Sequence, residues 1–134
     1  MHLGLPGCTS AFLIETTEGP ILIESGPASS LPYLRTGIEN AGFDPKDVCH
    51  VLLTHIHLDH AGAAGWFAQN NAKIYVHPVG APHLVDPSRL NASARRIYGD
   101  ALDSLLGEME ACPEEMVNAV HDTDEITVGD VSLT

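Results

Sequence analysis

A mostly apolar run at residues 48–54 (VCHVLLT) leads directly into the pattern H-x-H-x-D-H. A run of this length and composition predicts a buried β-strand. The side chains of the pattern are His55, His57, Asp59 and His60. On an extended chain, residues two apart point to the same side, so the first three are expected to converge. The fourth is expected to join them where the chain turns into the next helix. The pattern therefore requires a fold in which a buried strand ends in a polar cluster.

The chemistry of these four side chains indicates metal binding. Neutral imidazole and carboxylate are ligands that suit Zn²⁺, and also iron and manganese. The alternative is a set of polar side chains on a surface loop. Four possible metal ligands within six residues make that alternative a poor explanation. The end of a strand in an α/β protein is also where ligands usually bind. The residues that follow are small (Ala61, Gly62, Ala63 and Ala64), so neighbouring backbone can pack close to the cluster.

The rest of the chain predicts a single α/β domain over residues 1–134. The expected elements alternate between strands and helices. In order, they are a hairpin of strands at 11–15 and 21–24, a helix within 29–43, the strand at 48–54, a short helix within 62–71, a strand at 72–78, a loop with one helical turn at 79–93, a helix at 92–110 interrupted at Gly99, a short helix at 113–120, and a closing hairpin at 124–134 that turns at Gly129 and Asp130.

Composition narrows the classes of partner. The 18 acidic side chains against 6 basic ones give a formal net charge of −12, which disfavours a nucleic-acid backbone as partner. The longest apolar runs have the length of a strand, so no membrane span is expected. No signal peptide is recognised, so a cytoplasmic location is expected. A small-molecule substrate is expected as well. Cys8, Cys49 and Cys112 are far apart and odd in number, so they are expected to be small buried hydrophobic residues without a disulfide framework.

Several segments together resemble one known family. The segment THIHLDHAG is similar to the metal motif of the metallo-β-lactamase fold superfamily. FLIETTEGPILIESGP resembles the opening hairpin of that family, LPYLRTGIENAGFDPKDVCHVLLTH its first helix and following strand, and AKIYVHP the strand after the motif. The resemblance covers residues 10–80 closely and the remainder loosely. It implies that the chain forms the N-terminal half of an αββα sandwich.

The resemblance also implies a role for each residue of the motif. His55 and His57 would bind a first divalent metal ion, and Asp59 and His60 a second, with zinc expected and iron or manganese as alternatives. A metal-bound hydroxide would attack the carbonyl of a thioester or ester. In relatives with a single metal, Asp59 would instead orient the water or handle a proton, which makes it the expected catalytic residue.

Two departures from the family pattern stand out. Glu24, in LIESGP, stands where the family commonly has Asp, and the residue there helps to support the metal loop. The chain also stops at GDVSLT, near the point where the strand before the next metal-binding histidine is expected. Of the three later histidines, His77 is expected to be a capping or supporting residue and His121 a turn residue, while a lid or pocket wall is one alternative for His83. A longer enzyme, or a homo-oligomer in which two half-folds share a site, would supply the remaining ligands.

The resemblance leaves more than one function open. A thioesterase similar to hydroxyacylglutathione hydrolase (glyoxalase II) is the first prediction, because the chain shows no export signal. A lactonase, a β-lactamase and an iron-dependent redox enzyme are alternatives. A further alternative is a half-fold that binds metal without turnover.

Overall fold

The computed structural model describes residues 11–54, 56–121, 125–128 and 131–133. A five-stranded sheet forms its centre, in the order β1-β2-β3-β4-β5. The strands are β1 (Phe12–Ile14), β2 (Ile21–Ile23), β3 (His50–Leu52), β4 (Lys73–Val76) and β5 (Val117–Ala119). β1 is antiparallel to β2, and every other neighbouring pair is parallel. A separate antiparallel pair follows, β6 (Ile126–Val128) and β7 (Val131–Leu133).

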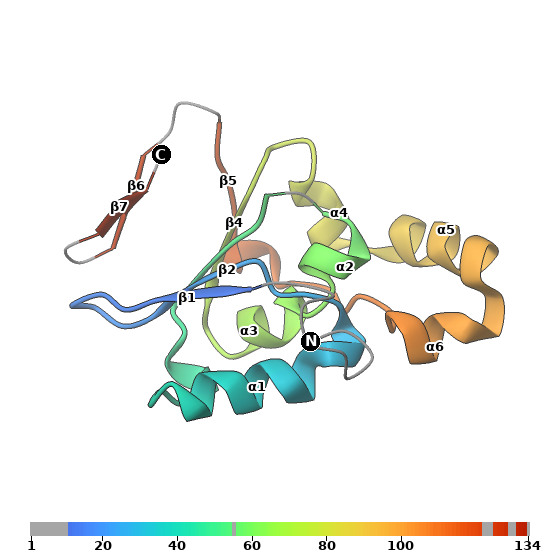
Figure 1. Ribbon diagram of the computed structural model, residues 1–134. Coiled ribbons are helices and arrows are strands. Elements are labelled where there is room, and N and C mark those ends of the chain that lie inside the picture. The colour runs from blue at the N-terminus through green and yellow to red at the C-terminus, as the bar shows by residue number, and fades with distance from the viewer. Residues whose placement is uncertain (1–10, 55, 122–124, 129–130, 134) are drawn as a thin grey trace.

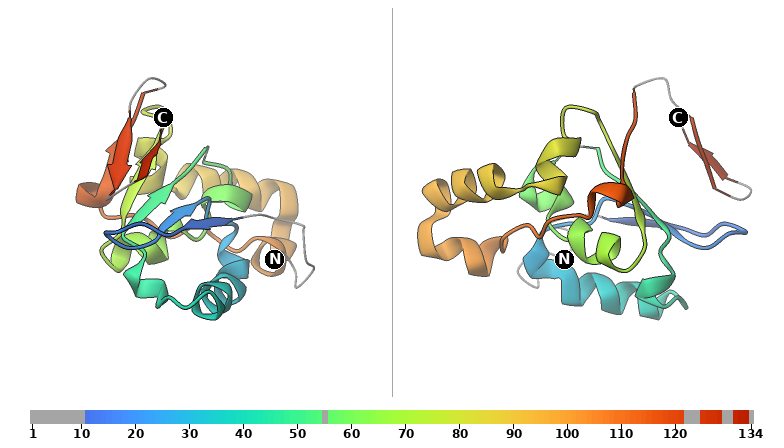
Figure 2. Two further views of the ribbon diagram at one scale, coloured as in Figure 1. Left: turned by 60° about the vertical axis from the view of Figure 1, so that its left-hand side comes forward. Right: turned by 180° about the vertical axis from the view of Figure 1, so that it is seen from behind.

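Helices connect the parallel strands and extend the domain at one end. The α-helices are α1 (Leu31–Asn40), α2 (Leu58–Ala61), α3 (Ala64–Gln69), α4 (Ala81–Val85), α5 (Ser88–Tyr98) and α6 (Leu102–Leu105). Single 3-10 turns lie at Ala28–Ser30, Pro45–Asp47, Gly99–Ala101 and Glu114–Met116. Helices α1 and α3 lie beneath the sheet, α5 and α6 extend from one end, and the β6–β7 hairpin stands at the other (Figures 1 and 2).

The core lies between one face of the sheet and these helices. Leu22, Val51 and Ile74 are paired across β2, β3 and β4, and all three are buried. Alternation along a strand places them on the same face, where they belong to one apolar cluster with Ile38 of α1 and Phe67 of α3. This packing sets the position of β3, the strand that leads into the histidine motif.

Most of the predicted elements are confirmed. The opening hairpin, the helix within 29–43, the strands at 48–54 and 72–78, the short helix within 62–71 and the closing hairpin are present. Gly99 interrupts the long helix as predicted, with a φ of 56° that favours glycine. Gly129 and Asp130, the predicted turn, lie outside the described residues. The family fold that the resemblance implied is also confirmed by comparison with solved structures, given below.

Two predictions about the second half are wrong. Residues 113–120 do not form a helix, because the 3-10 turn at Glu114–Met116 stops after one turn and Val117 continues as β5 beside β4. A β-branched residue fits this half-buried sheet position. The long helix also begins at Ser88, four residues before the predicted start, directly after Pro87.

In the part of the chain that the structure describes, no helix combines the length and the apolar character needed to cross a bilayer.

Candidate metal centre

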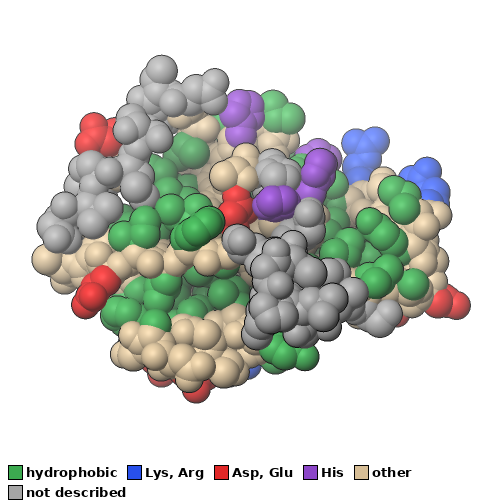
Figure 3. All heavy atoms as spheres, viewed as in Figure 1, with side chains coloured by type: hydrophobic (Ala, Val, Ile, Leu, Met, Phe, Trp, Pro, Cys, Tyr) green, Lys and Arg blue, Asp and Glu red, His purple; other side chains and the backbone are tan. Residues whose placement is uncertain are grey.

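The candidate site lies at one edge of the sheet, where parallel strands end. Glu24 directly follows β2, the histidine motif follows β3, His77 follows β4 and His121 comes shortly after β5. The carboxyl ends of parallel strands share one edge, so these residues come from four neighbouring strand ends. Figure 3 shows histidine side chains gathered on one face of the molecule, next to an acidic side chain. The topology thus concentrates possible ligands at the edge where α/β proteins bind their substrates.

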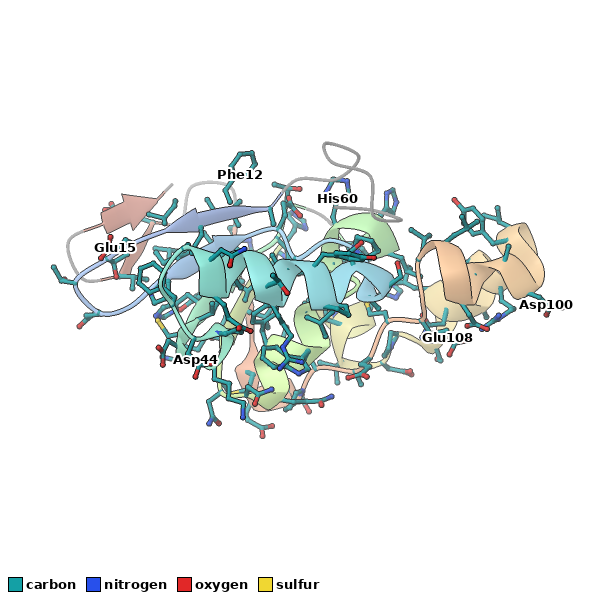
Figure 4. The ribbon with its side chains drawn as sticks, turned by 60° about the horizontal axis from the view of Figure 1, so that its bottom comes forward. Phe12, Glu15, Asp44, His60, Asp100 and Glu108 are labelled. Atoms are coloured by element: carbon teal, nitrogen blue, oxygen red, sulfur yellow. The ribbon has the colours of Figure 1, made fainter. Side chains whose placement is uncertain are left out.

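The motif is not extended throughout, which corrects the predicted geometry. His57 is the N-cap of α2, with φ −59° and ψ 147°, and Asp59 and His60 lie within that helix. The N–H groups of His60 and Ala61 both donate to the carbonyl of His57 at 2.9 Å, closing the first turn. Asp59 therefore sits on a helical turn and not on the extended chain that was predicted for it, while His60 comes after the chain has turned into the helix, as expected. His60 projects from α2 toward the surface (Figure 4).

Glu24 connects the end of β3 to this helix. Its side chain is buried, and its Oε1 accepts hydrogen bonds from the backbone N–H of Thr54 at 3.1 Å and from the Thr54 hydroxyl. Its Oε2 lies 3.4 Å from Nδ1 of His60. Glu24 has a φ of 66°, a left-handed conformation that is uncommon outside glycine and tends to occur at functional sites. The sequence indicated a supporting role for Glu24, but gave no sign of this direct contact with His60.

Backbone hydrogen bonds join the same two segments. The N–H groups of Ser25 and Gly26 donate to the carbonyl of His60 at 2.9 and 3.1 Å, and the Ser25 hydroxyl donates to it at 3.0 Å. In the other direction, the N–H of Ala63 donates to the carbonyl of Gly26 at 3.0 Å. The loop after β2 therefore holds both the side chain and the main chain of His60.

Small residues make this close approach possible, as predicted. Ala61, Gly62, Ala63 and Ala64 are all buried. A Cβ built on Gly62 would overlap the carbonyl oxygen of Leu58 and would lie 2.8 Å from the backbone nitrogen of Ala28. On the other side, a Cβ on Gly80, next to α4, would lie 2.5 Å from Cγ2 of Ile56. The motif is thus packed against backbone and side chains from two directions.

The later histidines take different positions. Nδ1 of His77 accepts a hydrogen bond from the N–H of Val79 at 3.2 Å, while α4, the helix that follows, has no side-chain cap. His83 is half-buried on α4, close enough to Asp86 to help lower the pKa of that carboxyl. The larger cause of that lowering is hydrogen bonding from Ser88. His121 is exposed.

The described residues fit a divalent cation without forming a complete site. Among them, no three His, Cys, Asp or Glu side chains are grouped closely enough to hold a metal ion. His55 and the side chain of Asp59, both predicted ligands, lie outside what the structure describes. The donors that are described suit such a cation, since His57 and His60 carry imidazoles and Glu24 places a buried carboxylate behind one of them.

The described cysteines have the character expected of small hydrophobic residues. Cys112 is buried, and burial raises the pKa of its thiol to about 12. Cys49 is half-buried, and burial also raises its pKa. Neither thiol is activated as a nucleophile, because the thiolate is the reactive form. Cys8 lies outside the described residues.

Comparison with curated proteins finds bacterial lactonases. An N-acyl homoserine lactonase of Bacillus cereus is 30% identical, over a match that covers 42% of this chain and 32% of the lactonase. An N-acyl homoserine lactonase of Bacillus thuringiensis is 29% identical over the same shares. The match therefore spans about one third of the length of these relatives.

Solved structures of similar fold are metallo-β-lactamases. A subclass B3 metallo-β-lactamase from a soil metagenome library is 28% identical with a TM-score of 0.73, covering 98% of this chain and 46% of that one. A subclass B3 metallo-β-lactamase of Bradyrhizobium japonicum is 25% identical with a TM-score of 0.70, covering 94% and 44%. The family model described as "Metallo-beta-lactamase superfamily" matches residues 5–134. The chain, with its mixed sheet whose parallel strands lead into a histidine motif, thus belongs to the metallo-β-lactamase superfamily.

Proposed function

We propose that this chain provides the metal-binding half of a hydrolase active site that opens a lactone. The observation that carries the proposal is the placement of His57 and His60 on one turn after a parallel strand, with Glu24 behind His60. The names of the lactonase relatives support the substrate class. The thioesterase predicted from the sequence is the second candidate, and the same experiment distinguishes the two.

The proposed ligands are His55, His57, Asp59 and His60. A bound divalent cation supplies Lewis acidity and makes a hydroxide available near neutral pH, with zinc the expected metal and iron or manganese as alternatives. His57 would hold the first of two cations and His60 the second, each through a ring nitrogen, with the backbone of both residues set by α2 and by the loop after β2. Asp59, which precedes His60 in the sequence, would orient the attacking water or carry its proton.

The test compares metal content and hydrolysis in matched variants. Protein purified without chelating resin is assayed for metal by elemental mass spectrometry. It is then assayed for hydrolysis of an N-acyl homoserine lactone, a β-lactam and a glutathione thioester. We expect His57→Ala to lose both metal and hydrolysis. His50→Gln is the control, because His50 lies at the start of β3 and bonds Tyr75 at 3.0 Å, away from the strand end that carries the motif.

Two results would count against the proposal. Hydrolysis that continues at the wild-type rate in His57→Ala would separate the activity from the motif. Wild-type protein that binds no added zinc would mean that these residues do not form a metal site in this chain. Preference for the glutathione thioester over the lactone would favour the second candidate.

A further inference from the structure

The carboxylate of Glu24 has a separate partner for each of its oxygens. Oε1 accepts from both the backbone and the side chain of Thr54, the last described residue before the motif. Oε2 faces the ring of His60 at 3.4 Å from Nδ1. The side chain of Glu24 is 8% exposed and that of His60 is 37% exposed. The contact is therefore shielded on the carboxylate side and open on the imidazole side.

Oε2 is the oxygen that needs a donor. Among the described residues it is buried and has no hydrogen bond of full geometry. A buried carboxylate oxygen left without a donor costs more than an ordinary unmade hydrogen bond, because its desolvation is not compensated. Nδ1 of His60 lies close enough to supply that donor with a small rotation of the ring.

We propose that Glu24 is a positioning residue that fixes the tautomer of His60, with the hydrogen on Nδ1 and the lone pair on Nε2. A histidine that binds metal through one ring nitrogen needs its other nitrogen protonated and held, and a carboxylate commonly does this. The relevance to metal binding rests on the proposed function. The tautomer itself does not, because it follows from the contact between Glu24 and His60 alone.

The surroundings give Glu24 little freedom to do anything else. Its left-handed φ of 66° turns the chain directly after β2, and Ser25 and Gly26 then bind the carbonyl of His60. The backbone of His60 and the backbone of Glu24 are thus fixed relative to each other. The side-chain contact is therefore made between two residues whose backbones are held in place.

Replacing Glu24 by Gln tests this arrangement with almost no change of shape. The amide oxygen can keep both hydrogen bonds from Thr54, which leaves the NH₂ group facing Nδ1 of His60. An NH₂ group only donates, so Nδ1 must become the acceptor and the hydrogen must move to Nε2. Glu24→Gln is therefore expected to reverse the tautomer of His60 rather than merely loosen it.

The measurement is a long-range ¹H–¹⁵N correlation spectrum of the metal-free protein, at a mildly alkaline pH where ordinary imidazoles are neutral. We expect the hydrogen of His60 on Nδ1 in the wild type and on Nε2 in Glu24→Gln. Thr54→Val is the matched control, because it removes the hydroxyl contact to Oε1, keeps the backbone one and should leave the hydrogen on Nδ1. The signals of His83 report whether each variant is folded.

A wild-type His60 that carries its hydrogen on Nε2 would overturn the proposal without any variant. A folded Glu24→Gln protein whose His60 tautomer is unchanged would also overturn it. The second readout is zinc affinity by competition with a chromophoric chelator, which Glu24→Gln should weaken by about 10- to 100-fold and Thr54→Val much less. If the wild type binds no zinc while the tautomers behave as expected, the proposed function fails and the role of Glu24 stands.

Discussion

Gly62 is the position where one added carbon should do most damage to the candidate site. It follows α2 with helical dihedral angles, φ −59° and ψ −35°, so alanine suits its backbone conformation. A Cβ there would nevertheless overlap the carbonyl oxygen of Leu58 and would lie 2.8 Å from the nitrogen of Ala28 and 3.0 Å from Cα of Pro27. All three atoms belong to backbone, which cannot move aside as the end of a flexible side chain can.

The sign of the effect follows from two opposed contributions. Replacing Gly by Ala in a compatible conformation stabilises a protein by about 0.4–1 kcal/mol, chiefly through the unfolded chain. Overpacking a filled site costs about 1–3 kcal/mol. We therefore expect Gly62→Ala to lower the free energy of unfolding, by up to about 2.6 kcal/mol, which is the largest difference between these contributions.

Gly37 provides a matched control for this substitution. It lies within α1, and a Cβ built on it meets no atom within 4 Å. Gly37→Ala should raise the free energy of unfolding by about 0.8–1 kcal/mol, the difference in helix propensity. Urea denaturation followed by circular dichroism measures both variants. A Gly62→Ala protein as stable as Gly37→Ala would refute the close approach between the loop after β2 and the chain after α2.

Three further outcomes can be measured on the same protein. Phe67→Ala should lower the free energy of unfolding by about 3–5 kcal/mol, because Phe67 is a fully buried core residue, and an unchanged urea midpoint would contradict its place in the core. Cys112, with its pKa raised to about 12, should resist iodoacetamide in the folded protein near neutral pH and react after unfolding, as peptide mass spectrometry would show. Hydrogen bonds from Arg95 lower the pKa of Asp103 below 3.8, so their stabilisation is present above that pH and is lost as the pH falls through the folded value. Asp103→Asn should therefore flatten the loss of stability in acid, and a pH series of urea titrations with an unaltered slope would argue against the ion pair.

Local patterns predicted the first half of the fold well. The hairpin of β1 and β2 follows from two β-prone runs around a turn, and the turn forms with Gly19 at φ 113°. Buried strands and helices with clear periodicity were also predicted, because an element that packs against a single core has apolar residues at regular intervals. Residues 113–120 lack such a pattern. Their strand, β5, forms because it pairs with the edge of β4, and that contact between distant segments is not encoded in the local sequence.

The candidate site was predicted in composition but not in geometry. The sequence identifies His57 and His60 as possible ligands, yet it suggested strand alternation where the structure has a helical turn. The contact between Glu24 and His60 joins residues 36 positions apart by numbering, and no local pattern reports such a pair. The left-handed φ of Glu24, which sets the direction of its carboxylate, could not be predicted from the sequence either, because glutamate rarely adopts that conformation.

The strand order of the central sheet has a consequence for how the chain folds. Each strand from β2 to β5 pairs with the strand that precedes it in sequence, so each of these four finds a partner that is already synthesised. Loop closure between sequence neighbours involves the shortest segments available, which favours fast pairing. A chain emerging from the ribosome can therefore add strands one at a time. Glu24 would already be in place when His60 arrives, so the support for the histidine can form before the histidine needs it.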